Sequence, residues 1–583
     1  MKYSTILYHE GLKNQGIYDI ISFNLMTKKG LKNMSKQLAD LFFSKLKYTM
    51  EQLEEMFPLR QLPEGAKVTR IAPSPTGFIH LGNLFGAVID ERLAHQSGGI
   101  FYLRIEDTDL KRQVEGGVEA IIDALDYFGL KFDEGATADP DNDNGAYGPY
   151  RQRQRKDFYH TYAKYLVEIG KAYPCFCTEE ELEEMRNKQQ ELKENFGYYG
   201  KWAKYRDADF DTVKAFIDAG TPYVLRYKSE GDPAKKKYVD DLVKGKLEFP
   251  ENEIDHVLLK SDGIPTYHFA HVVDDHLMRT THVVRGEEWL PTLPFHVQLF
   301  ETLGFKMPKY IHTSQLMKMD GESKRKLSKR KDPEFSLDFY KQEGIPVKSA
   351  MEYLLTILNS NFEEWRRANP DAGIDGFQFT TKKMGVSGML FDVDKLKDVS
   401  KNAISRFTAD EVYEEVCVWA EEYDKEFYTL LVKNGGEVAK SIFQIGRGGN
   451  KPRKDIALWG EVKDYMGFIY DEIFNPVYEY PASIAKEDLK AVLSAYKYIY
   501  SDSDEQQGWF DKIKELAVKF GFAAETKLYK ANPEQYKGHV GDVSMVLRVV
   551  VTGKQNSPDL WEIMKILGRD KVLERIDSAL KNI

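Results

Sequence analysis

The alternation of apolar and polar residues along the chain predicts regular elements from about residue 65 onward. The stretch KVTRIA at 67–72 alternates like the end of a strand, and LFGAVIDERLAHQ at 84–96 has the three- and four-residue spacing of a helix. The apolar run GIFYLRIEDTD at 99–109 predicts a second strand, and VEGGVEAIIDALDYFGL at 114–130 predicts an amphipathic helix. Strands that alternate with helices are typical of a parallel α/β sheet.

This pattern is interrupted and then resumes. A helical segment at 150–174 is followed by TEEELEEMRNKQQELKE, in which Thr178 and Glu181 have the spacing of a capping box. A mixed region continues to about residue 250, and the segment DHVLLKSDGIPTYHFAHVVDDHLM at 255–278 is again strand-like. This order predicts a domain inserted into the sheet.

The two ends of the chain differ from its middle. Residues 1–64 form a leader without recognisable chemistry, in which SKQLADLFFSKLKYTMEQLEEMF at 35–57 has helical spacing. From about residue 396 to the end, nearly every segment predicts helix. In SPDLWEIMKILG, for example, Ser557 is predicted to cap a helix that the following proline begins and Gly568 ends.

Composition limits the class of protein. A chain of 583 residues is too long for one hydrophobic core, and an apolar fraction of 42% argues against disorder over most of it. The net charge of −10 argues against a general nucleic-acid coat protein but permits local basic surfaces. Cys175, Cys177 and Cys417 cannot build a disulfide framework, which favours a reducing cytoplasm. No apolar run approaches the ~18 residues of a membrane helix, and no secretory signal is recognisable.

Candidate chemistry begins at the first predicted turn from strand to helix, in APSPTGFIHLGN. Such a turn is an anion site, because unpaired backbone N–H groups and the helix dipole both face the ligand. Gly77 and Gly82 allow close approach of the backbone, and His80 adds a donor aimed at phosphate. Alone, the segment also fits a hydrogen-bonded loop histidine in an unrelated α/β protein.

A basic loop far downstream changes this interpretation. ESKRKLSKRKD at 322–332 could by itself be a solvated surface loop. Paired with the His-Gly turn, however, it resembles the two signature motifs of class I aminoacyl-tRNA synthetases, HIGH and KMSKS. The segments RIAPSPTG, LRIEDTD, GPYRQ, PTYHFAHVVDDHLM and VVRGEEWL occur in the order of the glutamyl-tRNA synthetase pattern. The chain thus resembles the bacterial type of that family over about residues 65–583.

The resemblance implies an α/β fold, with a Rossmann-type parallel-sheet catalytic domain, an inserted domain and an all-α C-terminal region. The implied segments are the leader at 1–64, the first half of the Rossmann domain at 65–170, an inserted tRNA acceptor-binding domain at 171–255, the second half of the Rossmann domain at 256–320, the KMSKS loop and stem-contact region at 321–395, and an anticodon-binding region at 396–583.

The implied activity is ATP-dependent ligation of L-glutamate to tRNA. The α-carboxylate of glutamate attacks the α-phosphate of ATP, pyrophosphate leaves, and the adenylate acylates the 3′ end of tRNA(Glu), with tRNA(Gln) left open as a second acceptor. Both steps depend on positioning and charge stabilisation. Mg²⁺ arrives with ATP. The catalytic positions implied are His80, Gly82 and Asn83, where Asn83 replaces the last histidine of the motif, and Lys326, Ser328 and Lys329.

The family pattern also implies the two substrate sites. Glu106 ends a predicted strand, at the sheet edge where ligands bind, and its charge suits the substrate ammonium. Arg70 and Arg285 supply the two guanidinium groups that a dicarboxylate requires. His271 stands where many relatives carry Asn and can still donate to a carboxylate. The implied glutamate positions are Arg70, Ala72, Ser74, Glu106, Tyr267, His271 and Arg285, and the implied ATP positions are Gly77, His80, Gly82, Glu288, Trp289, Leu316 and Lys329.

Expectations for tRNA and metal are less specific. Arg453 aligns with an arginine that reads the third anticodon base in the family, whereas KLKDVSKNAI departs from the family pattern, which leaves contacts at 397–402 open. CFC at 175–177 matches half of a zinc knuckle, but no second Cys or His pair follows about 25 residues later, so we expect no zinc. The implied tRNA contacts are Arg151, Arg153 and Arg453; Arg155, Lys156 and Lys235–Lys237 are further candidates that could instead form a solvated face.

Other classes fit less well. A glutaminyl-tRNA synthetase needs no second cation for an amide and ends in a β-barrel, and a glutamyl-queuosine enzyme lacks the C-terminal domains. A nucleotidylyltransferase pairs a similar turn with a basic loop but would not carry the glutamate pocket. A non-catalytic paralogue would have lost His80, Lys329 or Glu106. We expect a monomer without membrane association.

Overall fold

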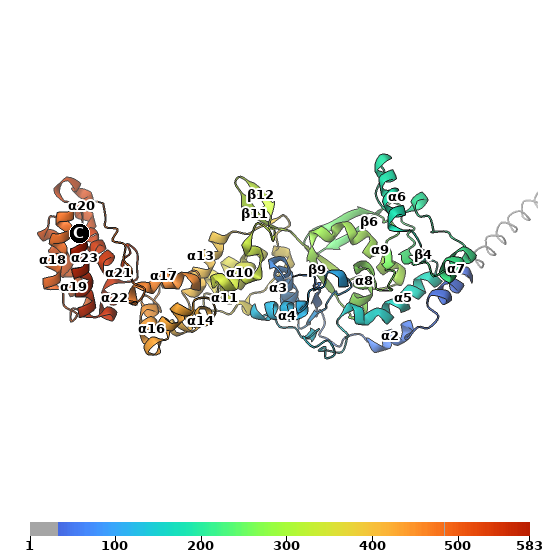
Figure 1. Ribbon diagram of the computed structural model, residues 1–583, viewed down its shortest axis with the longest axis horizontal. Coiled ribbons are helices and arrows are strands. Elements are labelled where there is room, and N and C mark those ends of the chain that lie inside the picture. Colours follow the sequence, from blue (N-terminus) through green and yellow to red (C-terminus); the bar gives the residue numbers. More distant parts are fainter. Residues whose placement is uncertain (1–32, 78, 483) are drawn as a thin grey trace, which may run out of the picture. The chain divides into compact units, whose positions relative to one another are not determined.

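A computed structural model describes residues 33–77, 79–482 and 484–583, which form two compact units. The first unit comprises the described residues up to Ser336 together with Ile357–Trp365 and Asp375–Phe391; the second comprises Leu337–Thr356, Arg366–Ile374 and Asp392–Ile583. The predicted α/β fold class with a helical C-terminal region is confirmed (Figure 1).

The first unit contains all the strands of the described chain and the helices that cover them. The strands are β1 (Val68–Ile71), β2 (Ile100–Leu103), β3 (Glu134–Gly135), β4 (Ala172–Cys175), β5 (Val224–Tyr227), β6 (Lys236–Asp241), β7 (Gly245–Pro250), β8 (Val257–Leu259), β9 (His282–Gly286), β10 (Lys309–Thr313), β11 (Leu316–Asp320), β12 (Ser323–Lys326) and β13 (Met389–Leu390). The helices include α2 (Met50–Met56), α3 (Leu81–His95), α4 (Gly117–Tyr127), α5 (Lys156–Glu168), α6 (Glu179–Glu191), α7 (Phe210–Asp218), α8 (Tyr267–Leu277) and α9 (Leu293–Leu303).

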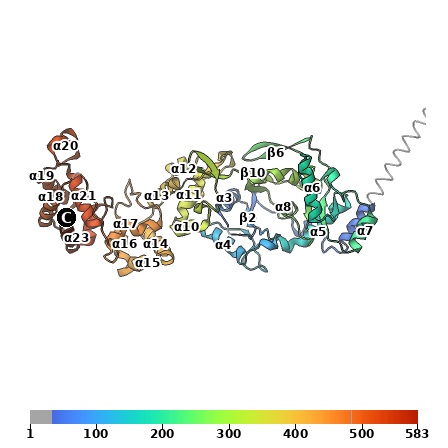
Figure 2. The ribbon, with the colours of Figure 1, turned by 45° about the horizontal axis from the view of Figure 1, so that its top comes forward.

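Parallel strands form the centre of the first unit. β2 pairs in parallel with β1 and β3, and β9 pairs in parallel with β10. β9 lies beside β1, where the amide of Thr281 donates to the carbonyl oxygen of Val68 at 3.0 Å. Helix α3 packs against β1, β2 and β9, and α8 packs against α5 and α9. Figure 2 shows α3 next to β2 and α8 next to α5. The chain thus leaves β1 toward β2 on one side and later returns to β9 on the other, and parallel sheets bind ligands at the carboxyl ends of strands at such a reversal.

One predicted strand region is mostly helix. Residues 255–278 read as strand-like, yet only β8 is extended and Tyr267–Leu277 is α8. Nearly all of α8 is buried, including Phe269, Val272 and Val273. Its charged residues Asp274 and Asp275 are buried too, where they accept from Arg155 and Arg104, so the polar positions of this helix do not mark a solvent-exposed face.

The region between α5 and α8 has antiparallel strands of its own. β5 pairs with both β4 and β8, and β6 pairs with β7 in a hairpin. The predicted capping box at the start of α6 is present, with Thr178 accepting from the amide of Glu181 and Glu181 accepting from the amide of Thr178. In the predicted leader, residues 33–42 and α2 are separate helices rather than one, because Thr49 starts α2 with a capping box; residues 1–32 lie outside the described chain.

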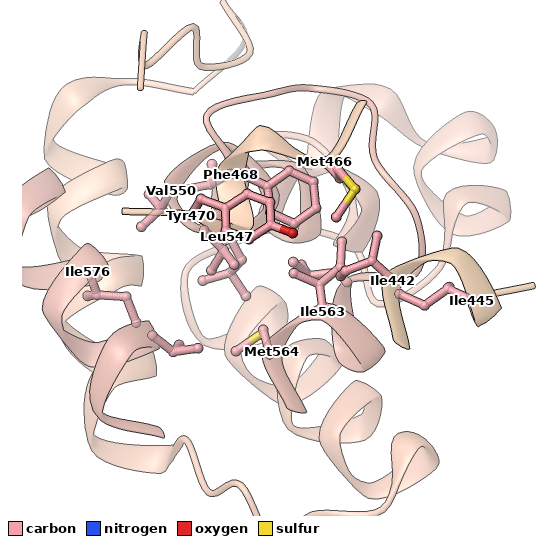
Figure 3. Close-up of a cluster of buried hydrophobic side chains, with 14 of the residues drawn as sticks. Ile442, Ile445, Met466, Phe468, Tyr470, Leu547, Val550, Ile563, Met564 and Ile576 are labelled. Atoms are coloured by element: carbon pink, nitrogen blue, oxygen red, sulfur yellow. The ribbon is translucent and has the colours of Figure 1, made fainter. Parts of the chain in front are cut away.

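The second unit is helical and has one large core. Figure 3 shows Ile442, Met466, Leu547, Ile563 and Ile576 directed into one shared cluster from five different helices. Helix α10 (Leu337–Glu343) belongs to the second unit, and the residues of α11 (Val347–Leu358) and α12 (Phe362–Ala368) are divided between the two units. The helices that follow are α13 (Val393–Ile404), α14 (Ala409–Tyr423), α15 (Lys425–Leu431), α16 (Glu437–Gln444), α17 (Val462–Met466), α18 (Lys486–Ile499), α19 (Gln506–Lys519), α20 (Thr526–Ala531), α21 (Val540–Thr552), α22 (Leu560–Leu567) and α23 (Arg569–Asn582).

The predicted cap of α22 is wrong by two residues. Asp559, not Ser557, caps the helix and accepts from the amide of Glu562 at 3.0 Å. The carbonyl oxygen of Ser557 instead accepts from Arg548 at 3.0 Å. Gly568 ends the helix as predicted.

Candidate active site

An open cavity of about 380 Å³ lies at the carboxyl ends of β1, β9 and β10. Most of the predicted site residues meet there, although they come from segments far apart in the sequence. Those that line the cavity are Arg70, Ala72, His80, Gly82, Asn83, Glu106, Tyr267, Arg285, Glu288, Trp289, Leu316 and Lys326. The predicted residues that do not line it are Ser74, Gly77, His271, Ser328 and Lys329.

The N-terminus of α3 forms one wall. His80 is the N-cap: its Nδ1 accepts from the amide of Gly82 at 3.1 Å, and its own amide donates to Oδ1 of Asn83 at 3.1 Å. A side chain at Gly82 would bring a Cβ within 3.1 Å of the His80 ring, which explains the glycine. Burial and the nearby charge of Lys329 lower the pKa of His80 to about 4. The imidazole is therefore neutral, and since Nδ1 is an acceptor, the proton is on Nε2.

Buried residues of the basic loop at 322–332 attach it to the rest of the first unit. The amide of Leu327, a buried residue, donates to the carbonyl oxygen of Leu316 at 3.0 Å. Asp332 accepts from both Nη atoms of Arg325, at 2.6 and 2.7 Å, and from the amide of Ser328 at 2.9 Å. The bonds from Arg325 lower the pKa of Asp332 to about 2. The loop is thus held by its buried residues, while Lys326 lines the cavity and Lys329 is exposed close enough to affect His80.

The two predicted arginines differ in the charge of their partners, which include a carboxylate for Arg70 and are histidines for Arg285. Arg70 forms an ion pair with Asp275, with Nε 3.3 Å from Oδ1, and Nη1 lies 3.4 Å from the carbonyl oxygen of Val284. Arg285 uses Nε and Nη1 for histidine partners, described below, but its buried Nη2 makes no hydrogen bond within the described chain. Arg285 therefore has an unsatisfied N–H group at the cavity.

Glu106 lies after β2 at the edge of the same cavity. Its side chain is 12% exposed, and Oε1 accepts from Nη2 of Arg104 at 3.2 Å. Burial raises the pKa of Glu106 to about 7, although the charges of Arg104 and Arg70 oppose this shift. The carboxyl group consequently titrates near neutral pH.

His271 does not line the cavity, and its predicted role in glutamate binding stays a prediction. It lies one turn deeper in α8 than Tyr267 and is fully buried, with its ring stacked on that of Tyr267 at 5.8 Å. Nδ1 is 2.7 Å from Oδ2 of Asp275, and Nε2 is 3.0 Å from the hydroxyl of Tyr310. Residues four positions apart lie on the same face of a helix, so His271 lies directly behind Tyr267 and supports its ring.

Two basic residues predicted to contact tRNA are buried instead. Arg151 is 6% exposed and donates to Oδ1 of Asp143 and to a backbone carbonyl, both at 2.5 Å. Arg155 is fully buried and donates to Oδ1 of Asp274 at 2.6 Å. Both guanidinium groups thus already have carboxylate partners, and their contact with tRNA stays a prediction.

The remaining tRNA candidates stay predictions. Arg153 and Lys156 are half-buried. Lys235, Lys236 and Lys237 carry partly exposed ion pairs with Asp232, Glu248 and Glu301. In the second unit, Arg453 pairs with Asp455 at 2.5 Å, and Lys397 pairs with Glu461 at 2.9 Å.

The CFC segment has no metal-ligand set around it. Sγ of Cys177 lies 3.5 Å from the hydroxyl of Tyr198, and Cys175 is buried beside it. Across the described residues, no group of three or more His, Cys, Asp or Glu side chains is placed to hold a metal ion. The absence of zinc remains a prediction. No helix in the described part of the chain has both the length and the apolar character needed to cross a membrane.

Sequence reasoning missed several groups near the cavity. Asp90 on α3 lines it, with a buried Oδ1 that has no hydrogen-bond partner among the residues that the structure describes, and burial raises its pKa well above the usual range. Phe335 stacks on His80 with ring centroids 4.5 Å apart. Asp90 carried little signal, because Glu91 and Arg92 follow it directly in the chain, and Phe335 carried none.

Comparisons with known proteins agree with this geometry. Residues 67–373 match the family described as tRNA synthetases class I (E and Q), catalytic domain, and residues 460–580 match the anticodon binding domain family. The chain is 53% identical to a glutamate–tRNA ligase of Acetivibrio thermocellus, over 94% of this chain and all of that protein. It is 50% identical to a glutamate–tRNA ligase of Clostridium perfringens, over 93% of this chain and all of that protein.

A solved structure is also similar. A glutamate tRNA ligase from Elizabethkingia meningosepticum, crystallised in complex with its amino acid, aligns with a TM-score of 0.69 at 27% identity, covering 88% of this chain and 99% of that one.

Proposed function

The chain belongs to the glutamate–tRNA ligase family of class I tRNA synthetases, and from this premise we propose that it activates L-glutamate with ATP and transfers it to the 3′ end of tRNA(Glu). One observation carries the assignment to glutamate: an arginine with an unsatisfied buried N–H group and a carboxyl group face the same cavity as the N-terminus of α3. That combination offers separate partners for a side-chain carboxylate, an ammonium group and a phosphate chain.

In the activation step, charge develops on the α-phosphate and on departing pyrophosphate. The Nε2–H of His80 is a donor suited to these oxygens, and the dipole of α3 favours negative charge at its N-terminus, where the amides of Gly82 and Asn83 already donate to His80. Lys326 lines the cavity and Lys329 lies close enough to change the pKa of His80, so both can neutralise the developing charge. ATP enters as its Mg²⁺ complex, which is substrate rather than a resident metal site.

Glutamate recognition divides between the two ends of the amino acid. Glu106, when ionised, pairs with the substrate ammonium. Arg285 binds the side-chain carboxylate through Nη2, because its histidine partners are neutral, whereas the charge of Arg70 is already balanced by Asp275. A glutaminyl-tRNA synthetase would have no use for this second cation.

The proposal also covers the tRNA contacts, the cellular location and the oligomeric state of the protein. The remaining candidates for tRNA contacts are Arg153, Lys156, Lys235–Lys237 and Arg453. The cysteines described are free thiols, which supports a reducing cytoplasmic location. We expect a monomer.

Aminoacylation assays test the proposal. The purified protein with ATP, Mg²⁺ and glutamate should charge tRNA(Glu), and glutamine in place of glutamate should give no product. Parallel reactions with tRNA(Gln) decide whether that acceptor is also used. Failure to charge either tRNA with glutamate would reject the proposed function.

A further inference from the structure

Arg285 is held by two buried histidines from different parts of the first unit. Its Nε donates to Nε2 of His312 at 2.9 Å, and its Nη1 lies 3.1 Å from Nδ1 of His296. The guanidinium carbon lies 4.6 Å from the ring centroid of Tyr310. Both histidines are fully buried, and neither lines the cavity. Two of the three guanidinium nitrogens are thus occupied, and the third, Nη2, is not.

The contact between Arg285 and His312 continues into the β6–β7 hairpin. Nδ1 of His312 donates to Oδ2 of Asp241 at 2.7 Å, so Nε2 is left as an acceptor for Arg285. Asp241 is itself fixed by the amides of Val243 and Lys244 at 2.9 and 2.7 Å. Burial alone would raise the pKa of Asp241, but these bonds outweigh it and lower the pKa. A permanent carboxylate therefore selects the tautomer of His312 that can accept from Arg285.

The contact between Arg285 and His296 continues into α8. His296 on α9 accepts from Arg285 at Nδ1, so the ring proton is on Nε2, which lies 2.9 Å from Nδ1 of His268. Burial keeps the pKa of His296 well below its usual value. A neutral imidazole is required here, because a protonated one could not accept from a guanidinium group.

We propose that His296 and His312 are positioning residues for glutamate specificity: they hold Nε and Nη1 of Arg285 and thereby direct the N–H groups of Nη2 at the side-chain carboxylate of the substrate. This inference rests on the proposed function. A positioning residue must supply a hydrogen-bond acceptor to Arg285. A residue with a purely structural role needs only to fill the space that the histidine ring occupies. The effect should fall on glutamate and leave ATP unaffected.

Paired substitutions separate an acceptor from a filled volume. His296→Asn keeps an oxygen near the position of Nδ1, and His312→Gln keeps one near the position of Nε2; His296→Leu and His312→Leu fill space without an acceptor. His282→Leu is the matched control, because His282 lies on β9 with Arg285, is 8% exposed and hydrogen-bonds to Thr281. Arg285→Ala removes the guanidinium group entirely, so it gives the largest effect on glutamate that the histidine variants could reach. ATP–pyrophosphate exchange with tRNA(Glu) present measures KM for glutamate and for ATP, and the preference for glutamate over glutamine.

We expect each leucine variant to raise KM for glutamate by about 10- to 100-fold and to reduce the preference for glutamate, as expected when a hydrogen bond to a charged group is lost. KM for ATP should change less than about twofold, and the Asn and Gln variants should recover most of the loss. The control should behave like the unaltered protein.

Three outcomes would overturn the proposal. The leucine variants could keep the glutamate KM and preference of the unaltered protein. They could raise the KM for ATP as much as that for glutamate. The amide variants could be no better than the leucine variants, which indicates packing alone. If the unaltered protein forms no glutamyl-tRNA, the proposed function fails as well, and that result is distinct from all three.

Discussion

Burial acts in opposite directions on the acids and bases around the cavity. It raises the pKa of Glu106 and Asp90 and lowers that of His80, His296 and His312. The imidazoles are therefore neutral donors and acceptors at physiological pH, while the charge in the pocket is carried by arginine, lysine and whichever acids remain ionised. Individual residues in this site are thus defined by their protonation state as much as by position.

At this scale, Lys329→Ala tests the basic loop. A cation that meets charge only in the transition state affects the barrier more than ground-state binding, so the exchange rate should fall by about 10²–10³-fold with little change in thermal stability. Lys331→Ala, two residues further along the exposed part of the loop, is the control. An exchange rate for Lys329→Ala close to that of the unaltered protein would contradict the assignment.

Glu106 predicts a pH dependence. Its pKa of about 7 lies above the ordinary 4.5, so this group favours the folded state at low pH, and that contribution is lost as pH rises from about 4.5 to 7. Binding of the substrate ammonium needs the ionised form. kcat/KM for glutamate should therefore fall about tenfold between pH 8 and pH 6. Glu106→Gln should be weaker throughout and lose this titration; an unaltered profile in that variant would exclude Glu106 as the group.

At the scale of elements, the turn before α3 is both a helix cap and a candidate phosphate site. The same local structure occurs at α21, where Nδ1 of His539 accepts from the amide of Gly541 at 3.0 Å and Asp542 accepts from the amide of His539 at 2.7 Å. A His-x-Gly-Asn or His-x-Gly-Asp sequence is therefore sufficient for a cap. What distinguishes α3 is the sheet edge and cavity beside it.

Capping and catalysis can be separated at His80. Asn is a good N-cap, so His80→Asn should keep the stability of the protein but lose much of the exchange activity, whereas His80→Ala should also lose about 1 kcal/mol of stability. His539→Ala is the matched control and should lose similar stability with full activity. Full exchange activity in His80→Asn would show that His80 serves α3 only.

The turn after β4 carries a prediction about metal. Two thiols beside Tyr198 cannot complete a tetrahedral zinc site. The purified protein should contain no stoichiometric zinc and should regain full activity after chelation once Mg²⁺ is restored. Elemental analysis that finds one zinc per chain would show that another side chain completes the site.

At the scale of the whole molecule, the chain consists of two units with separate cores, and the cavity belongs entirely to the first. Such chains often unfold in more than one step. A ligand that binds the native state raises only the stability of the structure that holds it.

Calorimetry should therefore resolve two unfolding transitions. With ATP and glutamate near 100 times their Kd, one transition should rise by about 3–5 °C and the other should stay in place. Arg285→Ala should reduce the shift produced by glutamate and keep the shift produced by ATP. A single transition, or equal shifts of both, would mean that the units unfold together.

The sequence by itself determined what depends on neighbours within a few positions. The capping box of Thr178, the end of α22 at Gly568 and the His80 turn are set by residues three positions apart or fewer, so their patterns could be recognised. The ordered family motifs also predicted most of the residues that line the cavity, because the motifs lie at the ends of strands and helices, where the cavity is formed.

Only the tertiary structure decided which polar groups are exposed and which partners they meet. Arg151 and Arg155 look like phosphate contacts until Asp143 and Asp274 are folded against them. The group that holds Arg285 comes from β10 and α9, and Asp241 comes from the hairpin far upstream in the sequence. Burial and hydrogen-bond partners arise when distant segments pack, and no local period or spacing in the chain records that packing.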